Sequence, residues 1–177
     1  MKKLIILILI VIGFVFAGLI SFAEQDGHWL YPNKIKAYIP PNHKRSVMMK
    51  HAFAEWTRLT NKKVLFYYVS SPAKADIRVS FVKMIPNADR QIGLTKSLIL
   101  STGKITSSEI LIAEKTPDGR QLGNDAVYTV MLHEIGHAIG LIEHSDNPLS
   151  IMYATEDDRQ EILKSDLKRL NGIYGWK

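Results

Sequence analysis

The stretch HEIGHAIGLIEHS, residues 133–145, decides the fold of this 177-residue chain more than any other segment. His133 and His137 are four positions apart, so on a helix both imidazoles leave the same face, one turn apart. Two imidazoles in that arrangement can bind one Zn²⁺ at about 2.0–2.1 Å each. Glu134 stands beside the first, where a carboxylate can take a proton from a water molecule at the metal. The stretch therefore predicts a helix that carries a catalytic zinc site.

Further features follow the two helical histidines. Gly140 stands where a helix ends in a left-handed residue, a conformation that glycine adopts without steric cost. His144 comes next, and Met152 lies in the segment Ser-Ile-Met-Tyr at residues 150–153. Each of these features is an independent requirement of the same kind of zinc site, so chance is a poor explanation for the whole set.

The first residues are typical of a targeting segment. Met1-Lys2-Lys3 is a short basic start, residues 4–20 form an apolar run of 17 residues, and small residues at Ser21 and Ala23 suit a signal peptidase. We expect residues 1–23 to be a signal peptide and the protein to be secreted, whether periplasmic or extracellular. An uncleaved N-terminal membrane anchor is the alternative, because 17 residues is at the lower edge of what spans a bilayer.

Residues 24–177 have the length of one domain with a single core, here expected to be the catalytic domain. The chain has 23 lysines and arginines against 17 aspartates and glutamates, but the basic residues are scattered, which argues against a nucleic acid partner. It has no cysteine, so an exported fold would not rely on disulfides. No thiolate of this chain could block a zinc ion.

Hydrophobic periodicity predicts the order strand, helix, four strands, helix, helix. Strands are expected at residues 35–39, 64–69, 76–82, 93–100 and 109–113. Helices are expected at residues 46–59, from a cap at Asn124 or Asp125 to Gly140, and from about Ser165. Residues 24–27 are interpreted as a linker, and Lys168-Arg169 as the solvated face of the last helix. This order predicts an α+β domain with helices packed against one twisted sheet.

On these residues the chain resembles the metzincin metalloproteases, and within them the matrixins. The motif that carries the resemblance consists of His133, Glu134, His137, Gly140, His144-Ser145 and the turn at residues 150–153. The resemblance implies a metzincin-like catalytic domain. Its sheet would be twisted, five-stranded and mostly parallel, with an antiparallel edge strand, and it would pack against long helices.

The resemblance also implies roles for the motif residues. It implies one catalytic Zn²⁺ held by His133, His137 and His144, with Glu134 as the general base, and with Gly140, Met152 and Tyr153 as structural support. In the family the glycine turns the chain back toward the metal, and the methionine forms an apolar base beneath it. Tyr153 directly follows the methionine, an offset that favours packing. Calcium is possible as a second cofactor, although the sequence contains no acidic loop like those of the animal matrixins.

The third ligand departs from the family pattern, which places it three residues after the glycine, at Glu143. His144 nevertheless stands eight residues before Met152, the spacing that the pattern shows from ligand to Met-turn. A one-residue insertion between Gly140 and His144 reconciles both ends. We expect His144 as the third ligand and keep Glu143 as the alternative, which would make the zinc a weaker Lewis acid.

The expected function is a zinc-dependent endopeptidase acting on peptide or protein substrates. Residues 93–100 would hold an extended substrate as an added antiparallel strand, or would be an ordinary edge strand blunted by Lys96. Two alternatives remain at this point. One is an inactive, zinc-stabilised module that binds peptides, and the other is a membrane-tethered protease whose N-terminal segment is never removed.

Overall fold

The computed structural model describes residues 26–86, 91–155 and 159–177. The signal peptide or anchor expected at residues 1–23 lies outside the described residues. None of the helices within the described ranges combines the length and apolar character that crossing a membrane requires.

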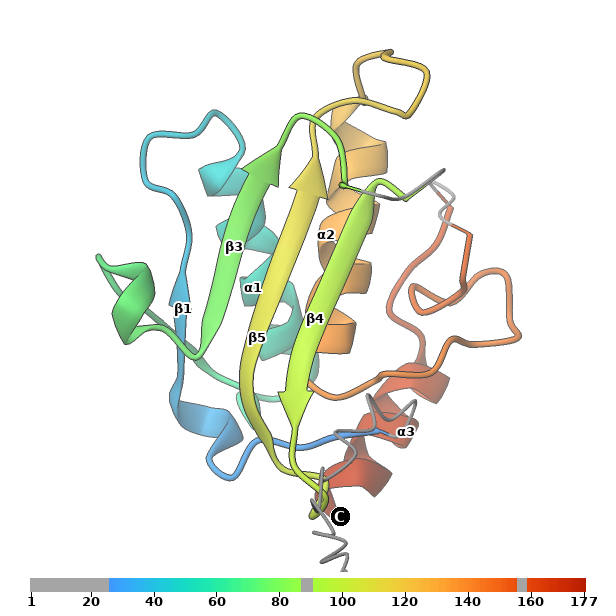
Figure 1. Ribbon diagram of the computed structural model, residues 1–177. Helices are drawn as coiled ribbons and strands as arrows, with labels where there is room; N and C mark the ends of the chain where they lie inside the picture. The colour runs from blue at the N-terminus through green and yellow to red at the C-terminus, as the bar shows by residue number, and fades with distance from the viewer. Residues whose placement is uncertain (1–25, 87–90, 156–158) are drawn as a thin grey trace, which may run out of the picture.

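Five strands form one sheet in the order β2-β1-β3-β5-β4. Their bounds are Ile35–Tyr38 for β1, Phe66–Tyr68 for β2, Ile77–Val82 for β3, Gly93–Ile99 for β4 and Ile105–Ala113 for β5. The first three and β5 run parallel, whereas β4 pairs antiparallel with β5 at the edge. Figure 1 shows the β4 arrow pointing against β3 and β5. The expected mostly parallel sheet with an antiparallel edge strand is confirmed.

Three α-helices accompany the sheet: α1 at Ser46–Leu59, α2 at Asn124–Ala138 and α3 at Lys164–Tyr174. Two short 3-10 turns lie at Pro32–Lys34 and Pro72–Lys74. Figure 1 shows α1 and α2 behind the sheet, on the same face, with α3 apart from them. The phenolic oxygen of Tyr174 donates to Ile139 O at 2.8 Å, which brings α3 to the C-terminal end of α2.

The core lies between the sheet and the two long helices. The apolar stripe of α1 at Met49, Ala52, Phe53 and Trp56 is fully buried, as its helical spacing predicts. Trp56 also ties the two helices together, because its indole nitrogen donates to Leu132 O at 2.9 Å. From Val127 onward most residues of α2 are buried, since the helix packs against α1, β4 and β5. A helix enclosed on all these sides is a rigid support for the residues that it carries.

Three sequence-based expectations need correction. β5 begins at Ile105 and not at residue 109. Polar residues such as Thr106 interrupt the apolar pattern in its first half, and the Thr106 hydroxyl donates to Leu98 O of β4 at 3.1 Å. The N-cap residue of α2 is Gly123, whose backbone is extended and which offers no capping side chain, and Asn124 and Asp125 already lie within the helix. Residues 26–27 are no linker within the described chain, since Gly27 is buried and its N–H donates to Gly140 O at 3.2 Å.

Candidate functional site

Helix α2 ends in a turn that sends the chain back across its own face. Gly140 N–H donates to His137 O and Leu141 N–H donates to Gly136 O, both at 3.0 Å, which is the Schellman pattern with glycine just past the cap. Gly140 has φ +120°, and a Cβ there would overlap Gly27 O. Gly140 therefore ends the helix as predicted. Its positive φ and its close approach to Gly27 both require a residue without a side chain.

The carbonyl groups that this ending leaves without helical partners are bonded to distant segments. Trp29 Nε1 donates to Ala138 O at 2.9 Å, and Tyr174 donates to Ile139 O. The last turn of a helix has such orphan carbonyls, and side chains often satisfy them. The end of α2 is thus fixed by residues from both ends of the described chain.

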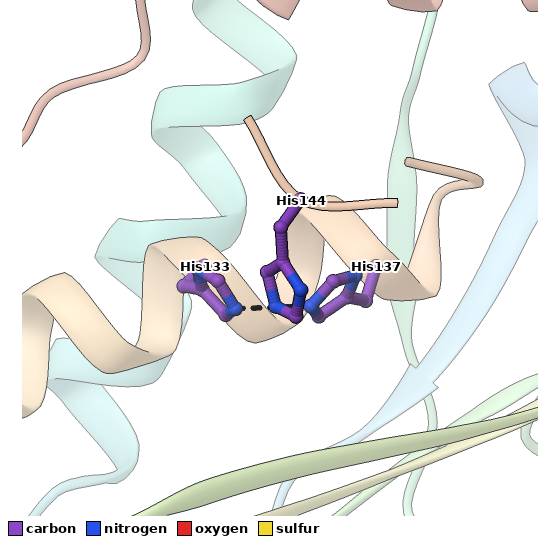
Figure 2. Close-up of side chains that lie close together, drawn as sticks. All are labelled: His133, His137 and His144. Carbon is purple, nitrogen blue, oxygen red and sulfur yellow. Dashed lines mark hydrogen bonds between the residues drawn. The ribbon is translucent and has the colours of Figure 1, made fainter. Parts of the chain in front are cut away.

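Three imidazoles meet at this end of the helix. Figure 2 shows His133 and His137 rising from α2 and His144 reaching down from the loop that follows. One ring nitrogen of each lies within 4.8 Å of the other two. Within the described residues these three form the only group of potential metal-ligating side chains of this kind. The structure thus brings together the three histidines that the sequence singled out.

The ring nitrogens of the helical histidines have distinct partners. His133 Nδ1 donates to Ile151 O at 2.7 Å, and His137 Nδ1 donates to Leu141 O at 2.6 Å. A proton on Nδ1 of a neutral imidazole leaves a lone pair on Nε2. The two Nε2 atoms are 2.9 Å apart, joined by the dashed line in Figure 2, and two such lone pairs attract only when a cation or proton lies between them. This donor set fits Zn²⁺, whose histidine ligands use the other ring nitrogen to bond a carbonyl or carboxylate.

Burial keeps these histidines neutral. Burial first, with a smaller contribution from the neighbouring imidazoles, lowers the pKa of His133 to about 4 and that of His137 to about 3. The pKa of His144 is also lowered, first by burial and then by the positive charge of Arg169. Neutral imidazole is the form that binds a metal, so the site is in its binding form at neutral pH.

The segment around Met152 packs against α2 and is bonded to the histidine loop. Its sulfur packs on α2 beside Trp56, where a Cβ on Gly136 would overlap it, so the methionine is pressed against the helix between the two histidine positions. Ser145 N–H donates to Met152 O at 2.7 Å, which joins the histidine loop to this turn. Met152 is buried and Tyr153 is half-buried.

The same turn is anchored to α3 through a residue that the sequence did not single out. The hydroxyl of Ser150 donates to Asp166 Oδ1 at 2.7 Å, and the other carboxylate oxygen accepts Leu163 N–H at 2.9 Å. Asp166 is buried, and it both caps α3 and fixes the turn whose Ile151 carbonyl orients His133. An aspartate three residues into a helix is an ordinary capping signal, so nothing in the sequence pointed to this second role.

Glu134 lies on α2 beneath the edge strand β4. Its side chain is almost fully buried, and the hydroxyl oxygen of Thr95 is 2.6 Å from Glu134 Oε2. Gly93 makes room for the other carboxylate oxygen, because a Cβ at that position would overlap Oε1. A general base at this place is therefore confined by two residues of β4.

Glu143 and His144 point in different directions. The ring centroid of His144 lies 5.3 Å from that of His133 and 5.0 Å from that of His137. The Glu143 side chain is 65% exposed, and its Oε2 lies 3.5 Å from Arg169 Nη2. The geometry thus brings His144, and not Glu143, to the two helical histidines.

The expectation that both Lys168 and Arg169 lie on the solvated face of the last helix is wrong for Arg169. Lys168 is exposed as expected, but the side chain of Arg169 is only 27% exposed and forms an ion pair with Asp26. Asp26 and Arg169 are 143 positions apart, so no local pattern could have joined them. His28, His43 and His51 lie outside the histidine cluster.

The fold described above is metzincin-like, as two solved structures show. Myroilysin superimposes with a TM-score of 0.55 at 12% identity, covering 85% of this chain and 96% of that one. Archaemetzincin from Methanopyrus kandleri gives a TM-score of 0.52 at 13% identity, with 84% and 96% covered. At such identities these likenesses concern the fold alone.

Sequence comparison then specifies the family. The matrixin family profile matches residues 28–175, and the chain therefore belongs to the matrixin family of metalloproteases. A probable matrix metalloproteinase of invertebrate iridescent virus 3 is 46% identical over 56 residues, and matrilysin of Felis catus is 35% identical over 66 residues. These matches cover 31% and 35% of this chain, but only 15% and 24% of the two relatives.

Proposed function

We propose that this protein is a zinc-dependent endopeptidase whose His133, His137 and His144 bind one catalytic Zn²⁺. The observation that carries the proposal is the convergence of three imidazole nitrogens, two of them in rings already bonded to carbonyls through Nδ1. Three histidines are a known ligand set of catalytic zinc, which keeps a fourth position open. Membership of a metalloprotease family supports peptide-bond hydrolysis as the reaction.

Glu134 is the general base in this proposal. Zn²⁺, when bound, supplies Lewis acidity that polarises a substrate carbonyl and lowers the pKa of a water molecule. Glu134 accepts the proton of that water and delivers it to the leaving amine. Its carboxylate is shielded from solvent and held by Thr95, so it is oriented before a substrate arrives.

The substrate would be an extended peptide lying along β4. This strand is the antiparallel edge of the sheet, and such an edge can accept one more strand through main-chain hydrogen bonds. Thr95 of β4 bonds directly to Glu134, so a peptide bound along this strand would run close to the proposed base. This contact favours a substrate-binding strand over an ordinary edge strand blunted by Lys96.

The proposal is tested by comparing the zinc-loaded parent with Glu134→Ala on a peptide library, with zinc content measured for both. Because general acid–base catalysis contributes about 10²–10⁴-fold, Glu134→Ala should bind zinc and lose that much turnover. Glu109→Ala, at an exposed position of β5, is the matched control and should cleave like the parent. Equal cleavage by the parent and Glu134→Ala would overturn the proposal. A zinc-loaded parent that retains peptides without cleaving them would identify the inactive binding module instead.

We also propose that the protein is exported and that residues 1–23 are removed. The support is the basic start, the apolar run and the small residues before Glu24. Mass spectrometry of the N-terminal peptide from expressing cells tests this: a chain beginning at Glu24 is expected. A chain that keeps Met1 in the membrane fraction would favour the tethered form.

A further inference from the structure

The loop between Gly140 and His144 is held by two side chains from outside the histidine cluster. Ile142 N–H donates to Asp26 Oδ1 at 3.0 Å. The carbonyl of Glu143 accepts a hydrogen bond from Arg169 Nη1 at 2.7 Å. These bonds fix the two residues that immediately precede the third histidine.

The two side chains are also bonded to each other. Arg169 Nε donates to Asp26 Oδ2 at 2.9 Å, and Arg169 Nη2 donates to Asp26 Oδ1. The side chains are 27% and 23% exposed, so the pair is shielded more than an ordinary surface ion pair. A guanidinium can bond two carboxylate oxygens and a carbonyl at once, because its donors form a rigid planar fork. One arginine thus ties Asp26 and the loop into a single unit.

The inserted residue makes such a restraint necessary. A loop with one residue more than the family pattern has more conformations, and each must be excluded before His144 faces the other imidazoles. The bonds to Asp26 and Arg169 restrict residues 142 and 143, and the charge of Arg169 draws the Glu143 carboxylate outward. His144 then continues from a backbone that is already fixed.

We propose that Asp26 and Arg169 are positioning residues that set the third zinc ligand, an inference that rests on the proposed function. Among the residues that the structure describes, neither side chain forms a hydrogen bond with an imidazole. They act through the backbone of Ile142 and Glu143, and so raise the affinity of the site for zinc. Outer residues that orient metal ligands typically change metal affinity by about 10- to 100-fold when they are lost.

One effect of Arg169 opposes this role. Its positive charge contributes to the lowered pKa of His137 and His144, and by the same repulsion it disfavours a bound cation. Removing the charge outright would therefore mix two effects of opposite sign. Arg169→Lys separates them, because lysine keeps the charge but has no planar fork to bridge Asp26 and Glu143 O together.

The experiment measures zinc affinity by competition with a chromophoric chelator, in the parent, Arg169→Lys, Asp26→Asn and the double variant. Lys168→Arg, on the exposed side of the same helix, is the matched control. We expect each single variant to bind zinc about 10- to 100-fold more weakly, with the control unchanged. The double variant should be little worse than either single one, because the two residues act as one unit. Circular dichroism and thermal unfolding of the metal-free proteins identify a variant that fails to fold.

The visible spectrum of the Co²⁺-substituted proteins gives a second readout. A displaced third ligand changes the coordination of cobalt, so both single variants should alter the absorption bands, and Lys168→Arg should not. Parent-like zinc affinity and cobalt spectra in folded Arg169→Lys and Asp26→Asn would overturn this inference while leaving the proposed function intact. A parent that binds no zinc would instead overturn the proposed function itself.

Discussion

The hydroxyl oxygen of Thr95 lies 2.6 Å from Glu134 Oε2 and 2.9 Å from the main-chain oxygen of the same residue. A residue of the edge strand thus holds both the side chain and the backbone of the proposed base. The hydroxyl can donate one proton, and the carboxylate is the closer acceptor. Because β4 is also the proposed substrate-binding strand, this contact would link the position of the substrate to that of the base.

Thr95→Val should therefore lower kcat with little change in zinc content. A hydrogen bond to a charged group contributes about 1.5–3 kcal/mol, which corresponds to roughly 10- to 100-fold in rate if all of it is needed in the transition state. Thr95→Ser keeps the hydroxyl and should restore most of the turnover. Steady-state kinetics of the two variants decide the matter. Parent-like turnover in Thr95→Val together with a loss in Thr95→Ser would show that the methyl group, not the hydroxyl, is what counts.

Gly140→Ala should destabilise the protein and weaken zinc binding. Its φ of +120° costs an alanine about 1–3 kcal/mol, and the added Cβ would also collide with Gly27 O. Gly172→Ala is the control, because a Cβ within α3 meets no atom within 4 Å and the helix gains about 0.5–1 kcal/mol over glycine. Urea unfolding of the metal-free proteins should shift in opposite directions, and a neutral Gly140→Ala would contradict the close approach of the two glycines.

His144→Ala should lose most of the zinc affinity, whereas Glu143→Ala should keep it. The reason is orientation, since the imidazole faces the cluster and the carboxylate faces Arg169. Equilibrium dialysis with zinc, followed by elemental analysis, measures both. If Glu143→Ala loses the metal and His144→Ala retains it, the third ligand is the carboxylate.

The metal-free protein should become less stable as the pH falls. Burial depresses the pKa of His133 to about 4 and of His137 to about 3, from an ordinary value of 6.5 that the unfolded chain retains. Below pH 6.5 the unfolded state binds more protons than the folded one, so the free energy of unfolding decreases down to about pH 4 through His133 and to about pH 3 through His137. The stabilisation is complete above pH 6.5 and is lost progressively below it.

Urea unfolding at pH 7.5, 6 and 5 measures this slope. The His133→Ala, His137→Ala double variant lacks both groups and should show a flatter dependence, since only His144 and the other titratable groups common to both proteins remain. If the free energy of unfolding depends on pH equally in the parent and the double variant, these two histidines do not contribute to the pH dependence of stability.

The elements with strong periodicity were predictable from the sequence, and those defined by polar residues were not. The stripe from Met49 to Trp56 predicted α1 with its observed ends, because burial against the sheet demands one apolar face. The predicted β5 was too short, because the first half of the strand carries polar side chains that form cross-strand hydrogen bonds and show no apolar alternation. The local pattern of apolar residues predicts which residues are buried, but it does not predict which polar side chains pair across strands.

The candidate site divides in the same way. His133, Glu134 and His137 were predictable because they share one helical turn, and His144 followed from its distance to Met152. Thr95, Asp26 and Arg169 were not, since each acts through a partner at least 26 positions away. Their chemistry is ordinary, and only the fold gives them their partners.

The bonds at the end of α2 also bear on the order in which the protein can be completed. Ala138 O is bonded to Trp29, 109 positions earlier, and Ile139 O to Tyr174, 35 positions later. Chains are synthesised from the N-terminus, and contacts between distant positions form only after both partners are available. In a chain that emerges N-terminus first, α2 with its two histidines is therefore available well before the turn beyond it has its last partner. Full assembly of this end of the molecule must wait until α3 has emerged as well.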